Sequence, residues 1–224
     1  MNTDTRFQKV EYSQTFNRLC REFNLRHKKV FDLGCGYGEY LSLFGEGSVG
    51  VNANEKEVGE ALSRGLSVVR GNIEELPILP VNETFDIIWA NNFFEHLLSP
   101  HEFLMHLRRF TAKSTKLILG VPVIPKTASL LHFVKFRGSL ASNHINFFTK
   151  DTLYLTVERA GWKVEAIRPF ITSVTWIDAL FSAFMPHVYV IASPISDFVY
   201  PPKKLMEWQG EKYYDHLLTI TKQK

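Results

Sequence analysis

Hydrophobic and polar positions alternate in blocks along the chain, and the period of the blocks changes repeatedly. From Tyr12 to Leu25 apolar residues recur every three or four positions, which predicts an amphipathic helix. The short apolar run at 30–33 ends in glycines, which predicts a buried strand. The same reasoning predicts helices at 39–44, 55–63, 100–110 and 149–160, and strands at 48–51, 67–70, 85–90, 116–121, 162–167 and 187–192.

Polar residues mark the ends of two of these helices. Asn54 precedes the helix at 55–63 as its N-cap, and Glu57 follows three residues later, as in a capping box. Thr149 is the expected cap of the last helix, and Gly161 is its expected stop.

Strands that alternate with helices predict an α/β fold with a doubly wound, mostly parallel sheet of seven strands. The length of 224 residues suits one such domain. We expect this domain over 1–200, with residues 1–28 as an N-terminal helical cap, and a tail over 201–224 after two prolines. Ligands bind at the carboxyl ends of the strands in such sheets, so the variable segments 123–140 and 170–186 are expected on the substrate side.

Composition narrows the class of protein. Hydrophobic residues make up 45% and charged residues 22% of the chain, as in globular proteins. The net charge of +3 is scattered, so no nucleic-acid partner is expected. The two cysteines fit no zinc or disulfide pattern, which favours a cytoplasmic location. No metal is expected, because histidines and acidic residues do not cluster at ligand spacing.

A glycine-rich loop follows the first predicted strand. Gly34, Gly36 and Gly38 let bare backbone approach a ligand. A dinucleotide-binding G-x-G-x-x-G motif would need glycine where the chain has Glu39. A carboxylate at a helix start disfavours a pyrophosphate and suits a cationic ligand. Asp32, at the strand end, is placed to accept a hydrogen bond from an ammonium group.

The segment Asp32–Gly38, with the sequence DLGCGYG, resembles the D-x-G-x-G-x-G motif of class I S-adenosylmethionine-dependent methyltransferases. Further resemblances follow in the family's order at 49–52, 71–77 and 85–90. The segments 94–97 (FEHL) and 143–149 (NHINFFT) resemble the subgroup that includes ubiquinone-pathway O-methyltransferases. Together these matches span about residues 30–167.

The resemblance implies S-adenosylmethionine as the cofactor, with transfer to a small-molecule or lipid-like acceptor on oxygen. It assigns Asp32 to the amino group of the cofactor, the loop residues Gly34, Cys35, Gly36 and Gly38 to its methionine part, Asn52 and Ala53 to the ribose, Asn72 and Ile73 to the adenine, and Asn91 to the departing methyl.

Asn52 and Asn72 depart from the family, which usually has a carboxylate at these positions. An amide has fewer acceptor sites for the ribose hydroxyls, at a cost on the order of 1 kcal/mol for each weakened bond. On this ground alone Asp in place of Asn52 should tighten cofactor binding. The two exchanges leave open a catalytically weak or inactive cofactor-binding protein, while an NAD-dependent oxidoreductase is the least favoured alternative.

His144 and His96 are the candidate catalytic residues. Methyl transfer is an in-line displacement, and an oxygen acceptor needs a base that titrates near neutrality. Each histidine has the alternative of bracing its loop. The apolar stretch 170–186 is open to four interpretations: a lid, a membrane-surface helix in peripheral contact with lipid, a dimer contact or a core helix.

Overall fold

The computed structural model describes residues 3–125, 143–172, 174–181 and 184–198. Contacts divide the chain into one unit of residues 1–194 and a second of 195–224. Every helix and strand below belongs to the first unit. The expected tail and most of the expected segment 123–140 lie outside the described residues, so the proposed domain limits stay predictions.

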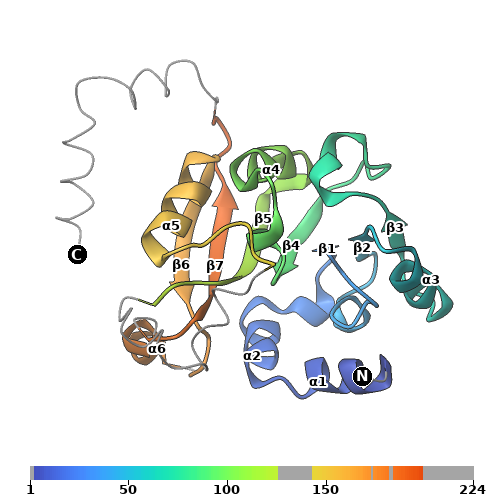
Figure 1. Ribbon diagram of the computed structural model, residues 1–224, viewed down its shortest axis with the longest axis horizontal. Helices are drawn as coiled ribbons and strands as arrows, with labels where there is room; N and C mark the ends of the chain where they lie inside the picture. The colour runs from blue at the N-terminus through green and yellow to red at the C-terminus, as the bar shows by residue number, and fades with distance from the viewer. Residues whose placement is uncertain (1–2, 126–142, 173, 182–183, 199–224) are drawn as a thin grey trace. The chain divides into compact units, whose positions relative to one another are not determined.

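One seven-stranded sheet forms the centre of the first unit (Figure 1). Its order is β3-β2-β1-β4-β5-β7-β6, with β7 antiparallel to both neighbours and the other pairs parallel. The predicted doubly wound, mostly parallel α/β sheet is therefore confirmed. The strands are β1 (Val30–Leu33), β2 (Val49–Asn52), β3 (Val68–Arg70), β4 (Phe85–Asn91), β5 (Thr111–Pro122), β6 (Trp162–Arg168) and β7 (His187–Pro194).

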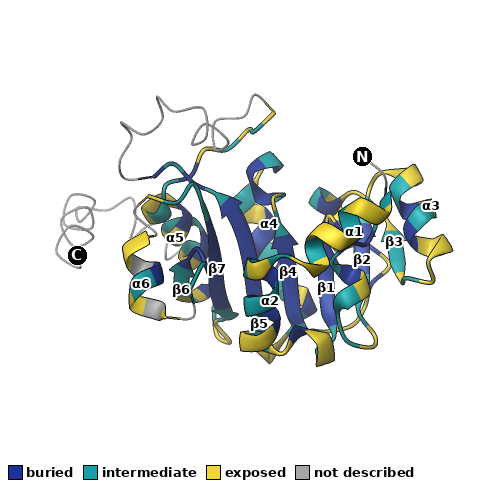
Figure 2. Cartoon of the chain, turned by 90° about the horizontal axis from the view of Figure 1, so that it is seen from below, coloured by how far each residue is buried: buried dark blue, intermediate teal, exposed yellow. Residues whose placement is uncertain are grey.

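Helices cover both faces of this sheet. Successive residues of a strand point to opposite faces, so Trp89 packs with α2 in one core cluster and Ile88 packs with α4 and α5 in the other. Figure 2 shows the strands as buried and the outer sides of the helices as exposed. The described α-helices are α1 (Thr3–Glu11), α2 (Gln14–Phe23), α3 (Glu55–Ser63), α4 (Pro100–Leu107), α5 (Lys150–Arg159) and α6 (Thr175–Phe181).

The predicted caps are mostly confirmed. Asn54 accepts hydrogen bonds from the backbone N–H groups of Lys56 and Glu57 at the start of α3. The Glu57 carboxylate does not close the expected capping box, because it accepts from the Asn52 amide at 2.6 Å instead. Thr149 forms a reciprocal capping box at the start of α5. Gly161 follows that helix with φ +86°, a left-handed conformation that suits glycine.

Two predicted helices are wrong in their extent. The helix expected from Tyr12 to Leu25 begins only after Ser13, which caps α2, and a separate helix α1 precedes it. The helix expected at 39–44 is absent, and only the 3₁₀ turn η2 (Leu41–Leu43) forms there. The turn ends at Phe44, whose φ of −88° and ψ of 169° are those of extended backbone.

The described part of 170–186 contains α6. Trp176 and Leu180 are exposed, whereas Asp178 is buried and accepts hydrogen bonds from the backbone and hydroxyl of Thr172. None of the described helices is long and apolar enough to cross a bilayer. The four interpretations of this stretch, peripheral membrane contact included, therefore stay predictions, as does the cytoplasmic location.

Phe16 of α2 joins the N-terminal helices to the sheet. Its buried ring lies edge-on to Tyr40 and Trp89, with centroid distances of 5.0 and 5.6 Å. Phe16→Ala should lower the free energy of unfolding by about 3–5 kcal/mol, because it leaves a cavity in the core. Urea unfolding measures this loss. The control Tyr12→Ala removes a ring that is 78% exposed and should change little. An equal loss in both variants would contradict the assignment.

Candidate functional site

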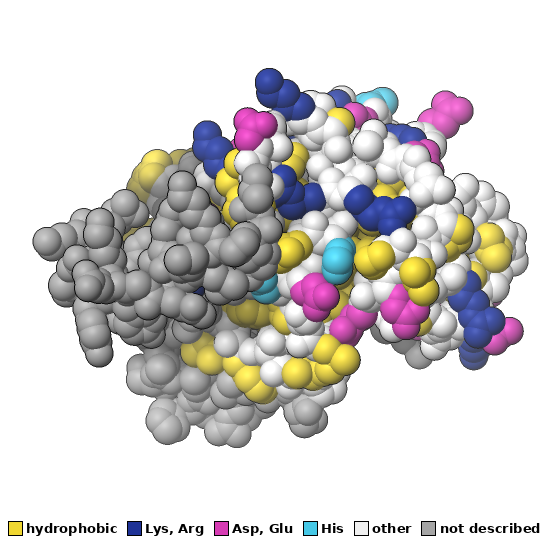
Figure 3. Space-filling model, turned by 90° about the horizontal axis from the view of Figure 1, so that it is seen from above, with side chains coloured by type: hydrophobic (Ala, Val, Ile, Leu, Met, Phe, Trp, Pro, Cys, Tyr) yellow, Lys and Arg dark blue, Asp and Glu magenta, His cyan; other side chains and the backbone are white. Residues whose placement is uncertain are grey.

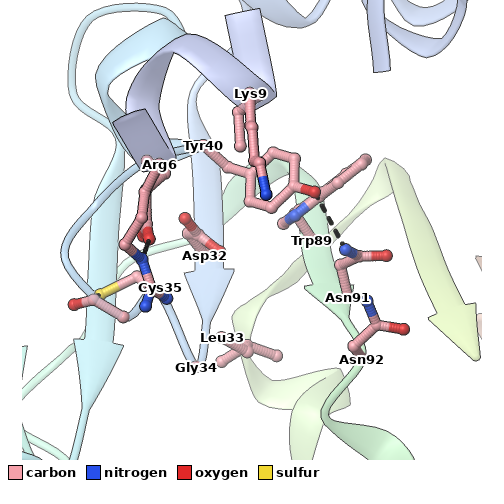
Figure 4. A pocket seen from close by; sticks show the side chains of 13 residues that line it. Arg6, Lys9, Asp32, Leu33, Gly34, Cys35, Tyr40, Trp89, Asn91 and Asn92 are labelled. Atoms are coloured by element: carbon pink, nitrogen blue, oxygen red, sulfur yellow. Dashed lines mark hydrogen bonds and ion pairs between the residues drawn. The ribbon is translucent and has the colours of Figure 1, made fainter. Parts of the chain in front are cut away.

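A cavity of about 410 Å³ opens at the carboxyl end of β1, beside the point where the strand order reverses (Figure 4). Ligands of doubly wound sheets bind at such a switch point. The walls come from α1, the glycine loop after β1, and the end of β4. The lining residues are Arg6, Lys9, Val10, Asp32, Leu33, Gly34, Cys35, Gly36, Glu39, Tyr40, Trp89, Asn91 and Asn92.

The glycine loop is folded tightly onto β2. The backbone N–H groups of Gly34 and Cys35 both donate to the carbonyl of Val51, at 2.9 and 3.1 Å. Gly38 has φ +87°, and a Cβ added there would lie 2.3 Å from a methyl carbon of Leu66. Of the four predicted loop residues, Gly34, Cys35 and Gly36 line the cavity, whereas Gly38 serves the turn behind it.

Asp32 is a buried carboxylate in the cavity wall. Its Oδ2 atom is buried, and it has no hydrogen-bond partner within the described part of the chain. Burial is the main reason that the pKa of Asp32 is raised well above its usual value, and the charge of Glu39 raises it further. A cationic ammonium group would relieve both effects. The residues present therefore fit the amino-acid end of S-adenosylmethionine, which would bind with its ammonium at Asp32.

Glu39 has a different role from the one that the sequence suggested. It does not begin a helix, and its carboxylate accepts from the Arg6 guanidinium at 2.5 Å and from the Tyr37 backbone at 3.1 Å. Arg6 therefore neutralises its charge. The preference for a cationic ligand rests on Asp32 rather than on Glu39.

The helix α1 covers the cavity with Arg6 and Lys9, which extend from it in Figure 4. No residue of α1 is buried, so its sequence lacks the apolar period that would have predicted it. Polar and ring contacts hold it instead, since Arg64 of the α3 end pairs with Asp4 and lies over the ring of Phe7. Neither Arg6 nor Lys9 could therefore be identified as a cavity residue from the sequence pattern.

The end of β4 supplies two amides to the cavity. Asn91, as predicted, lines it, and its Nδ2 donates to the Tyr40 hydroxyl at 3.1 Å while its Oδ1 is buried without a partner among the described residues. Asn92 has φ +51° and its Oδ1 lies 2.8 Å from His187 Nε2. Burial lowers the pKa of His187 to about 4, so its ring is neutral at pH 7. Asn92, Tyr40 and His187 had not been predicted.

The predicted ribose and adenine residues lie outside the cavity lining. Asn52 is partly buried, and its amide donates to the Gly36 carbonyl at 3.3 Å. Ala53 and Asn72 are exposed, and Asn72 caps the 3₁₀ turn η3 (Ile73–Ile78). The Ile73 side chain is buried in the core, which leaves only its backbone for a ligand. These assignments stay predictions.

His96 and His144 are distant in the sequence but lie side by side in the structure. His96 Nδ1 lies 2.9 Å from the backbone carbonyl of Asn143, which is 47 positions away in the chain. Their ring centroids are 5.0 Å apart, and Glu95 lies next to both rings. Neither histidine lines the cavity, so their catalytic role stays a prediction. Burial raises the pKa of Glu95, and the two histidines oppose that rise.

The expected absence of a metal had rested on the lack of clustered ligands along the sequence. That reason is wrong, because the ligand atoms of Glu95, His96 and His144 lie within 4.8 Å of one another. The fold joins a loop after β4 to one before α5, which linear spacing cannot reveal. Glu95 was missed as a site residue although it precedes His96 directly.

Because of the contacts that Asn52 makes, we expect Asn52→Asp to weaken cofactor binding, which is the opposite of the expectation from the sequence alone. Its amide donates to the Glu57 carboxylate as well as to the glycine loop. Asn52→Asp would lose both donated bonds and set two carboxylates side by side. We expect S-adenosylmethionine affinity to fall by about tenfold, or about 1.4 kcal/mol. Calorimetric titration measures this change.

The double variant Asn52→Asp with Glu57→Gln is the matched control. It restores a donor between the two side chains, so it should recover most of the lost affinity. Tighter binding by the single variant would show instead that the carboxylate helps the ribose more than it harms the loop.

Comparisons with known proteins agree with this geometry. A family model described as a methyltransferase domain matches residues 5–167. Among solved structures, an S-adenosylmethionine-dependent methyltransferase from Mesorhizobium loti aligns with a TM-score of 0.61 at 14% identity, covering 82% of this chain and 99% of its own. One from Archaeoglobus fulgidus aligns with a TM-score of 0.59 at 23% identity, covering 86% and 100%. At these identities the structures show the fold.

Curated relatives correct the expected acceptor. A tRNA U34 carboxymethyltransferase from Hydrogenovibrio crunogenus is 28% identical over 62% of this chain and 46% of its own. One from Pseudomonas fluorescens is 32% identical over 71% and 53%. The chain thus spans about half the length of these relatives. They contradict the expected small-molecule acceptor and the expected lack of a nucleic-acid partner, and they do not support the ubiquinone-pathway subgroup.

The match to the family model covers most of the chain, and it includes the glycine loop, the cavity and the end of β4. The buried Asp32 carboxylate and the bare loop backbone fit the cofactor of this family. The chain therefore belongs to the class I S-adenosylmethionine-dependent methyltransferases.

Proposed function

We propose that this protein transfers a methyl or carboxymethyl group from a sulfonium cofactor to a base of tRNA. The observation that carries the proposal is the similarity to tRNA U34 carboxymethyltransferases, which extends over 62% and 71% of the chain in the two relatives described above. An RNA acceptor replaces the small molecule that the sequence motifs had suggested.

The cavity has side chains that suit a nucleobase beside the cofactor. The partly exposed Tyr40 lines it, and aromatic rings of this kind stack on unpaired bases in RNA-binding proteins. Asn91 and Asn92 add amide groups, which pair with the edge of a base. Transfer is then an in-line displacement, in which the protein holds the base edge against the sulfonium.

The face drawn in Figure 3 offers RNA no continuous track of positive charge. Figure 3 shows one face, on which Lys and Arg side chains are spread among apolar and acidic ones. Arg6 and Lys9 bring positive charge to the cavity itself. In this proposal the protein recognises tRNA mainly through a base that is flipped out into the cavity, and less through a row of contacts to backbone phosphates.

The transferred group has two candidates. A methyl group follows from the family, whereas the names of the curated relatives specify a carboxymethyl group. A carboxymethyl donor carries one more carboxylate than S-adenosylmethionine. The Lys9 side chain in the cavity lining adds positive charge there, which suits the extra carboxylate of the second candidate.

Incubation of the enzyme with unmodified tRNA transcripts and the cofactor tests the proposal. We expect a modified uridine in the nucleoside digest, detected by mass spectrometry, with the mass increase identifying methyl or carboxymethyl. The loop variant Gly38→Val should abolish the product, because the added side chain meets Leu66 at a backbone φ that only glycine adopts easily.

Two outcomes would contradict the proposal. One is cofactor binding without modification of any tRNA in a complete mixture of transcripts. The other is methylation of a phenolic or lipid acceptor at a rate that exceeds the rate with tRNA.

A further inference from the structure

Three potential ligand atoms meet outside the cofactor cavity. They are one carboxylate oxygen of Glu95 and one ring nitrogen each from His96 and His144. His96 Nε2 lies 3.8 Å and His144 Nε2 lies 3.9 Å from the same oxygen, Oε1 of Glu95. These distances are too long for hydrogen bonds, so a direct N–H···O contact does not explain the arrangement.

The hydrogen bond at the far side of the His96 ring defines its tautomer. His96 Nδ1 lies 2.9 Å from the backbone carbonyl of Asn143, and a carbonyl can only accept, so Nδ1 carries the proton. In the neutral ring Nε2 then presents a lone pair toward Glu95. A lone pair beside a carboxylate oxygen is unfavourable unless a proton or a metal ion lies between them. Metal-binding histidines are oriented in this same way, by a bond from the second nitrogen to a carbonyl.

Glu95 is itself held in place and incompletely satisfied. Glu95 is 2% exposed, and its Oε2 atom is buried without a hydrogen-bond partner among the described residues. Its backbone carbonyl accepts from the N–H groups of Ile145 and Asn146, at 3.0 and 2.9 Å. The Asn146 amide also donates to the Leu97 carbonyl at 2.6 Å. These bonds fix the loop after β4 against the loop before α5, so the three ligands are positioned before any ion arrives.

We propose that Glu95, His96 and His144 bind a divalent transition-metal ion of the zinc class. Two imidazoles and one carboxylate are a donor set that zinc uses in proteins, with bonds of about 2.0–2.2 Å. The two nitrogen–oxygen distances need to shorten by only roughly half an ångström to surround such an ion. Mg²⁺ and Ca²⁺ prefer oxygen ligands and suit this set less well. The site is independent of the acceptor proposed above.

Titration of the metal-free full chain, without an affinity tag, with ZnCl₂ tests the site. We expect one zinc ion per chain by calorimetry and a higher melting temperature with zinc, because the ion joins two loops in the folded state only. We expect zinc binding to weaken in each of three variants, His96→Ala, His144→Ala and Glu95→Gln. The loss should exceed the roughly 10- to 100-fold that follows when a residue hydrogen-bonded to a metal ligand is removed. His106→Ala is the matched control, since His106 lies 3.5 Å from Glu102 on the surface of α4.

Binding of Co²⁺ in place of Zn²⁺ tests metal coordination directly, because residues that only stabilise the fold would not give Co²⁺ visible absorption bands. Bound Co²⁺ should show visible absorption bands in the wild-type chain and in His106→Ala, and not in His144→Ala, with circular dichroism confirming that each variant is folded. Equal zinc affinity in wild type and in a folded His144→Ala variant would overturn the proposal, as would loss of binding in His106→Ala alone.

Discussion

The structure depends on the two hydrogen bonds that the N–H groups of Gly34 and Cys35 donate to the carbonyl of Val51. They turn the chain sharply at the end of β1 and hold the loop against β2, next to the point where the strand order reverses. The turn leaves Asp32 buried with one oxygen unpaired and exposes bare backbone to the cavity. The amino-acid end of S-adenosylmethionine suits both features, because its ammonium group can pair with Asp32 and its chain can lie against the bare backbone of the loop.

Local patterns in the sequence were sufficient for the sheet and its ligand edge. Short apolar runs predicted all seven strands, six of them to within about two residues, because buried strands are bounded by glycine, proline or polar residues. The exception is β5, which begins at Thr111 rather than at residue 116. The glycine loop was expected at a ligand because the carboxyl ends of parallel strands share one edge, whereas Asn91 was assigned from the family resemblance. Gly34, Gly36 and Asn91 all line the cavity. Caps at Asn54 and Thr149 followed from short-range chemistry.

What the sequence missed depends on contacts between distant residues. Helix α1 has no buried face, so only its pairing with Glu39 and Arg64 reveals that Arg6 reaches the cavity. The Asn52 amide looked like a weakened carboxylate until its bond to Glu57 gave it a role as a donor. Glu95 and His144 are far apart in the chain, and the bonds that join their loops create the cluster. The proposed acceptor rests on relatives, because no local motif encodes it.

The central claim is that Asp32 binds the ammonium group of S-adenosylmethionine. Calorimetric titration of the cofactor into Asp32→Asn, with Glu83→Gln as a control at an exposed surface carboxylate, tests it most directly. We expect the affinity for S-adenosylmethionine to fall by roughly 10- to 100-fold in Asp32→Asn, because a charge-assisted hydrogen bond is lost, and to be unchanged in Glu83→Gln. Equal affinity in Asp32→Asn and the wild-type enzyme would contradict the account.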